Sequence, residues 1–136
     1  MLCGEQCAVV NNVEVPREND ASRFKVKGVV AGVSLDMLLD SGAAVSVLRE
    51  GLVNTKIYPT KYSNFTGANG GLLDVCGVVY VWVELYGLLR KVQFYVVKNL
   101  NQNCILGVNG LRAFNVRMDF RNDKVVIAQI ENRGLN

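Results

Sequence analysis

The residues best suited to do chemistry in this chain are Asp40, Ser41, Gly42 and Ala43, which follow the apolar run at residues 33–39. An apolar strand that ends in this way places a carboxylate at a sheet edge, beside a hydroxyl and a residue without a Cβ. Gly42 lets the backbone turn sharply and another chain come close, and Ser41 can hydrogen-bond to neighbouring backbone. Asp, Ser and Gly are also the usual residues of a plain turn, so the tetrapeptide alone leaves both readings open.

The chain contains no histidine, and this narrows the chemistry available to it. The absence excludes Ser-His-Asp and Cys-His mechanisms, the His-Glu-x-x-His metalloproteases and most catalytic zinc sites. A hydrolase of this composition must work with carboxylates, lysines, hydroxyls or thiols.

The four cysteines indicate free thiols in a reducing compartment. Cys76 and Cys104 lie in apolar, strand-like surroundings and are typical of small buried residues. Cys3 and Cys7 lie together in a polar stretch, but a zinc site needs about four Cys or His ligands and no second local pair is present. We therefore expect no metal and no other cofactor.

Two further segments lie downstream of the Asp40 loop. Residues 65–72 read Phe-Thr-Gly-Ala-Asn-Gly-Gly-Leu, and Asn-Gly between two strand-forming runs predicts a tight hairpin because both residues tolerate positive φ. Residues 104–111 read Cys-Ile-Leu-Gly-Val-Asn-Gly-Leu, about sixty residues beyond Asp40, and residues 116–120 follow as Val-Arg-Met-Asp-Phe.

In these segments the sequence resembles the retropepsins, the aspartic proteases of retroviruses and long-terminal-repeat retrotransposons. The matching pieces are the Asp-[Thr/Ser]-Gly-Ala loop at residues 40–43, the flap hairpin at residues 65–72, and Ile-[Ile/Leu]-Gly-x-[Asn/Asp]-x-Leu at residues 105–111. They occur in the family's order over about residues 22–130, and together they are specific. The closing stretch at residues 118–124 looks more like the retrotransposon enzymes than the retroviral ones.

The resemblance implies a role for each matching residue. Asp40 would be the catalytic aspartate. The Ser41 hydroxyl would contact the Ser41 region of the other copy in a dimer, and Gly42 would be the backbone acceptor for substrate. Gly107 and Asn109 would support the loop from behind. The substrate-binding residues would be Ala43 and Ala44 beside the loop, and Thr66, Gly67, Ala68, Asn69, Gly70 and Gly71 at the flap tip.

The sequence departs from the retroviral pattern at two positions. Many retroviral members carry an acidic residue where Ala44 stands and an arginine where Val108 stands, and these two side chains pair. Both residues are apolar here, so the ion pair is absent. The first twenty residues match nothing in the family core.

Aspartic protease chemistry needs two carboxylates around one water, one ionised and one protonated. This chain offers a single Asp-Ser-Gly, and its remaining aspartates are expected on the surface or in turns: Asp20, Asp36, Asp74, Asp119 and Asp123. The second catalytic aspartate must therefore come from another copy, and an isologous dimer places Asp40 opposite Asp40. We expect an aspartic endopeptidase that is active as a homodimer on an extended peptide or polyprotein substrate.

The elements that must position these residues are strands. Phe24, Val26 and Gly28 alternate with Lys25 and Lys27, which predicts a half-buried strand. Further strands are predicted at residues 33–39, 45–48, 72–85, 92–97, 104–107, 116–120 and 124–130, with a helical turn or two at residues 110–114. The pattern indicates an all-β fold, and the resemblance makes it a retropepsin-like closed barrel with a flap hairpin and one short C-terminal helix.

The predicted domain boundaries follow the composition. Residues 1–21 are polar and are predicted as an N-terminal tail or pro-segment, with a short strand around residues 13–15. Residues 22–131 form the protease domain and residues 132–136 a C-terminal tail. No run of about 18 apolar residues occurs and the first residues lack the flank of a secretory signal, so we expect no membrane partner. The expected location is the cytoplasm or a retroelement particle.

Three other readings compete with a retropepsin-type protease. The first is a non-catalytic module of the same fold, domesticated from a retroelement, that dimerises or binds peptides; the intact Asp40 loop argues against it. The second is a host protease of the ubiquitin-shuttle type, which the short loop before the hairpin fits less well. The third is a nucleic-acid-binding barrel that uses Tyr80, Trp82 and nearby lysines, but the net charge of +3 is spread along the chain and forms no basic stripe.

Overall fold

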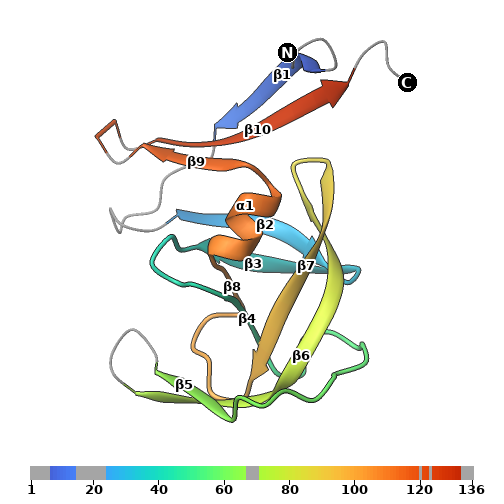
Figure 1. The fold of residues 1–136 in the computed structure, drawn as a ribbon, viewed down its shortest axis with the longest axis vertical. Helices are drawn as coiled ribbons and strands as arrows, with labels where there is room; N and C mark the ends of the chain where they lie inside the picture. Colours follow the sequence, from blue (N-terminus) through green and yellow to red (C-terminus); the bar gives the residue numbers. More distant parts are fainter. Residues whose placement is uncertain (1–6, 15–23, 67–70, 120, 123, 133–136) are drawn as a thin grey trace.

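A computed structural model of the chain describes residues 7–14, 24–66, 71–119, 121–122 and 124–132, with backbone alone for residues 7–14 and 128–132. Six strands hydrogen-bond in a closed ring, because the first strand of the main sheet also pairs with the sixth, through Val29↔Glu84 and Val30↔Val83. In ring order these strands are β2 (Phe24–Val30), β3 (Val33–Leu39), β8 (Cys104–Leu106), β4 (Ser46–Arg49), β7 (Leu88–Val97) and β6 (Leu72–Leu85). The all-β closed barrel is confirmed (Figure 1).

The barrel interior is filled by the apolar positions of these strands. Along β2, Phe24, Val26 and Val30 are buried while Lys27 is exposed, which is the alternation that the sequence predicts. The helix α1 (Val108–Ala113) begins at Val108, two residues before the predicted helical turn, and its Leu111 belongs to the same core. The helix follows β8 directly and therefore lies next to the strand that supports the Asp40 loop.

A second sheet of three strands has the order β1 (Cys7–Glu14), β10 (Lys124–Asn132) and β9 (Val116–Asp119). It lies at one end of the molecule, beyond α1 (Figure 1). β1 pairs antiparallel with β10 from Cys7↔Asn132 to Glu14↔Val126. The stretch predicted as a tail therefore contains a strand that begins well before the short strand expected at residues 13–15. Its backbone partner lies at the other end of the chain, so local sequence gave little sign of it.

The predicted hairpin is present as β5 (Asn64–Thr66) paired antiparallel with the start of β6, from Asn64↔Asp74 to Thr66↔Leu72. Its turn at residues 67–70 lies outside the described residues. A register shift between Val75 and Gly77 separates this part of β6 from the part that belongs to the barrel wall. A bulge of this kind bends a strand, and here it directs β6 out of the wall and into the hairpin.

Within the described residues, no helix is both long and apolar enough to cross a membrane.

Candidate active site

The Asp40 loop begins where β3 leaves the barrel. The Asp40 N–H donates to the Leu106 carbonyl of β8 at 3.1 Å, and the Ala43 N–H donates to the Asp40 carbonyl at 3.2 Å, closing a tight turn. The Gly42 N–H donates to Asp40 Oδ1 at 2.9 Å. The turn thus fixes the carboxylate in one direction, and a Cβ at Gly42 would lie 3.2 Å from that same oxygen. The segment is a turn that holds a partly exposed carboxylate.

The far side of this loop rests on Gly107. The N–H of the next residue, Val108, donates to the Ala43 carbonyl at 2.8 Å. A Cβ on Gly107 would lie 2.6 Å from that carbonyl oxygen and closer still to the Val45 carbonyl, so only glycine fits. The expected supporting role of Gly107 is confirmed by these contacts.

Ser46 is a positioning residue that the sequence analysis missed. It is fully buried, and it is the one buried polar side chain among residues 24–127 with a described environment. Its hydroxyl accepts from the Gly107 N–H at 3.0 Å and donates to Asn109 Oδ1 at 2.7 Å. Asn109 Nδ2 in turn donates to the Gln93 carbonyl at 3.0 Å, so Asn109 links Ser46 to β7 and is connected to the loop through Ser46 and Gly107. The sequence did contain a signal for this role, since Ser46 is a single hydroxyl residue beside the apolar residues of β4.

Replacing Ser46 by Ala is expected to destabilise the protein by about 2 kcal/mol, since it leaves a buried N–H and an amide oxygen without their partner. Thermal unfolding should show a Tm lower by several degrees. The exposed Ser34 on β3 gives a matched control, because Ser34→Ala removes a hydroxyl from a strand without burying any unpaired group. Equal Tm values for the two variants would mean that the Ser46 hydrogen bonds contribute no net stability.

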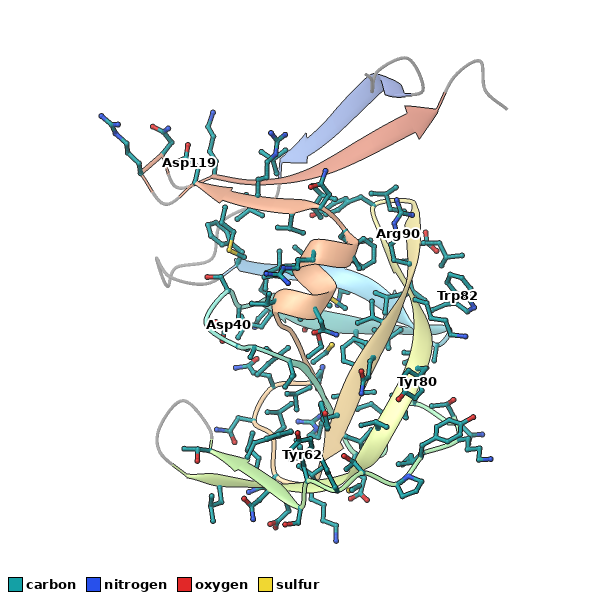
Figure 2. All side chains as sticks on the ribbon, in the orientation of Figure 1. Asp40, Tyr62, Tyr80, Trp82, Arg90 and Asp119 are labelled. Carbon is teal, nitrogen blue, oxygen red and sulfur yellow. The ribbon has the colours of Figure 1, made fainter. Side chains whose placement is uncertain are left out.

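The remaining predicted site residues are placed as follows. Ser41 and Ala44 are exposed and Ala43 is partly buried, while Thr66 and Gly71 are exposed on either side of the hairpin turn. Gly67, Ala68, Asn69 and Gly70 lie outside the described residues. Figure 2 shows Asp40 on the opposite side of the barrel from Tyr80 and Trp82.

Ala44 and Val108 are both apolar and form no ion pair, so other contacts must join the loop to the start of α1. Ala44 is exposed and Val108 partly buried. The loop is instead held to α1 by the bond from the Val108 N–H to the Ala43 carbonyl, and by the Ser46 bonds to Gly107 and Asn109.

A small apolar cluster joins the hairpin to the barrel. Leu73 and Val75 of β6 pack with Val47 of β4, Ile105 of β8 and the buried Leu100, outside the main core. Phe65 of β5 also packs edge-on against Tyr95 of β7, with ring centroids 4.8 Å apart. The base of the hairpin is therefore anchored on β4, which follows the Asp40 loop, and on β7 and β8.

Two of the other aspartates have ordinary structural roles, as expected. Asp36 forms an exposed ion pair with Lys27 at 2.9 Å, and the hydrogen bond and charge of that lysine lower the pKa of Asp36. Asp119 accepts from the Asn122 side chain at 2.7 Å and from its N–H at 3.2 Å, which lowers the pKa of Asp119 and stabilises the turn after β9. Neither aspartate lies in an Asp-Ser-Gly loop like that of Asp40.

The two described thiols are not activated nucleophiles. Cys104 is fully buried, and burial raises the pKa of its thiol. Burial and a hydrogen bond to Glu50 Oε2 at 3.3 Å raise the pKa of Cys76. Both therefore stay protonated at neutral pH. Cys3 lies outside the described residues, which contain no cluster of three or more His, Cys, Asp or Glu side chains suited to a metal.

The aromatic residues considered for nucleic-acid binding lie on the surface of the barrel, on the side away from Asp40. Tyr80 and Trp82 are 50% and 53% exposed on β6. Lys91 Nζ lies over the Trp82 ring at 5.6 Å, and Tyr80 packs edge-on against Tyr58. These rings thus already have neighbours within the chain, and Figure 2 places them away from Asp40.

Comparison with known proteins identifies the class. The sequence profile of the aspartyl protease family matches residues 26–109, more than half of the chain, so the chain belongs to this family. The matched range contains the Asp40 loop, Ser46 and Asn109. No curated protein sequence gives a significant match.

Solved structures agree on the fold. A retropepsin-like aspartic protease from Rickettsia conorii has a TM-score of 0.64 at 20% identity and covers 90% of this chain and 94% of its own. The EIAV protease, complexed with the inhibitor HBY-793, has a TM-score of 0.62 at 21% identity over 76% of this chain and 99% of its own. The retroviral protease-like domain of Ddi1 from Leishmania major has a TM-score of 0.57 at 21% identity over 85% and 95%. The chain has the retropepsin fold, as its sequence predicts.

Proposed function

We propose that this protein is an aspartic endopeptidase that is active as a homodimer, with Asp40 of each copy as the catalytic carboxylate. The observation that carries the proposal is the Asp40 turn, in which a partly exposed carboxylate is oriented by Gly42 and supported through Gly107 in a member of the aspartyl protease family. A chain without histidine has few other groups that could activate water.

The proposed reaction uses the two Asp40 side chains as a pair. Two carboxylates at close range cannot both be charged without a large cost, so they share one proton. The ionised carboxylate takes a proton from a bound water, and the resulting hydroxide attacks the peptide carbonyl carbon. The protonated carboxylate polarises the carbonyl oxygen. The proton taken from water then passes to the leaving amine as the C–N bond breaks.

The proposed dimer follows from what one chain supplies. Each copy has a single Asp-Ser-Gly loop, and Ser41 and Ala44 are exposed in the isolated chain. A two-fold axis through the loop brings Asp40 opposite Asp40 and allows each Ser41 to contact the other copy.

The proposed substrate is an extended peptide segment of a polyprotein. The peptide would lie between the Asp40 loop and the hairpin, with Gly42 as a backbone acceptor and Ala43 and Ala44 beside it. Thr66, Gly71 and the turn between them would close over it as a flap, excluding water from the reacting bond. We further propose a retrotransposon-like rather than retroviral origin, and action in the cytoplasm or a retroelement particle.

The test is incubation of the chain with a mixed peptide library at acidic and neutral pH, with and without a statine-containing inhibitor. We expect cleavage at internal peptide bonds, and we expect the inhibitor to block this cleavage. Inhibitor binding without any cleavage would instead support the non-catalytic peptide-binding module. Cleavage that the inhibitor leaves unchanged would contradict an aspartic mechanism.

A further inference from the structure

Asn99, just after β7, makes two side-chain hydrogen bonds to the flap strand. The Asp74 N–H of β6 donates to Asn99 Oδ1 at 3.0 Å, and Asn99 Nδ2 donates to the Leu72 carbonyl at 2.9 Å. Both partners lie in the part of β6 that forms the hairpin with β5. The side chain is exposed, so burial does not explain its orientation.

These two bonds begin where the backbone pairing between β6 and β7 ends. The ladder between β6 and β7 runs from Leu85↔Leu88 to Val75↔Val97, and the Lys98 N–H adds one bond to the Asp74 carbonyl at 3.0 Å. Beyond this point the chain turns inward to the buried Leu100. A carboxamide carries donor and acceptor groups like those of a peptide unit, so the Asn99 side chain continues the ladder in place of backbone.

The hairpin segment around Leu72 and Asp74 is consequently held on both edges. β5 pairs with one edge through Asn64↔Asp74 and Thr66↔Leu72, and the Asn99 side chain pairs with the other. An isolated two-stranded hairpin is only marginally stable in water. The hydrogen bonds from Asn99 add an attachment to the barrel side, and they limit how far the hairpin can move from the barrel.

The loop that carries Asn99 also leads directly to the support of the Asp40 loop. Leu100 packs in the apolar cluster with Val47. The Arg49 guanidinium donates to Asn103 Oδ1 at 2.7 Å, and the Arg49 backbone N–H donates to the Asn103 carbonyl at 3.0 Å. β8 begins at the next residue, and its Leu106 carbonyl accepts from the Asp40 N–H. One short stretch of chain therefore contacts the hairpin at one end and Asp40 at the other.

We propose that Asn99 is a positioning residue that sets the distance of the β5–β6 hairpin from Asp40 and thereby the affinity for an extended peptide. The inference rests on the proposed function, because it assigns the hairpin as the flap of that site. The described hydrogen bonds of Asn99 go to Asp74 and Leu72 and not to Asp40, so its effect is on binding rather than on proton transfer.

The experiment compares Asn99→Ala with wild type in two measurements. Hydrogen exchange of the Asp74 amide, followed by NMR without ligand, should accelerate about fivefold, since each of two exposed hydrogen bonds contributes at the low end of the usual range. The Kd of a statine-containing peptide and the KM of a cleaved peptide should rise by about the same factor, with kcat roughly unchanged. Asn101→Ala, an exposed asparagine in the same loop, is the matched control and should alter neither quantity.

Asn99→Asp refines the result, because it keeps the acceptor for the Asp74 N–H and loses the donor to the Leu72 carbonyl. It should restore part of the protection at Asp74. Unchanged Kd and KM in Asn99→Ala, with an active wild type, would overturn the positioning role and leave the proposed function standing. A wild type that neither cleaves peptides nor binds the inhibitor would overturn both, whatever the exchange rates show.

Discussion

Asp40→Asn is expected to abolish peptide cleavage, lowering kcat/KM by at least about 10³-fold, which lies within the range that general acid–base groups contribute. The amide has nearly the shape of the carboxylate, and its oxygen can still accept the Gly42 N–H that orients the side chain at 2.9 Å. It cannot take a proton from water. The loss should therefore appear in the chemistry while the Tm changes little.

Asp36→Asn is the matched control for this prediction. Asp36 is an exposed strand residue paired with Lys27, so the same substitution there removes a charge without touching the Asp40 loop. Its activity should equal that of wild type. A folded Asp40→Asn protein that cleaves peptides as fast as Asp36→Asn would show that Asp40 is not the catalytic group.

Most of the barrel was predictable because its strands carry local signals. Phe24 and Val26 alternate with lysines, and the predicted bounds of β3 and β6 match the structure. The helix start was placed two residues late, because Gly107 at its N-terminus offers no side-chain cap that would mark the boundary. The full length of strand β1 was not predicted, since Asn11 and Asn12 are poor strand formers and their partners in β10 lie far away in the sequence.

The candidate site was predictable to a different extent. The order Asp40 to Ala43 identifies the loop, but the residues that position it are far away in the chain. Ser46 meets Gly107 across 61 positions, and Asn99 meets Leu72 across 27. Neither a serine at the start of a short apolar strand nor an asparagine just after a strand has a local pattern that distinguishes it from an ordinary residue. Such partners become visible only when the fold brings the segments together.

Co-refolding wild type with a tenfold excess of Asp40→Asn chains is expected to lower cleavage per wild-type chain about tenfold, because by mass action most wild-type chains then pair with an inactive partner. Such a mixed dimer has one carboxylate and one amide at its site. It lacks the pair that must share a proton, so it should be inactive. Serial dilution of pure wild type should likewise reduce specific activity below the dimer dissociation constant.

A tenfold excess of Asp36→Asn chains is the control for this mixing experiment, since these chains keep Asp40 and should form active mixed dimers. Their addition should raise total cleavage rather than lower it. The comparison separates loss of the second carboxylate from any effect of crowding or aggregation. If an excess of Asp40→Asn chains leaves cleavage per wild-type chain unchanged, each chain works alone, and the second acidic group must then be sought within one copy.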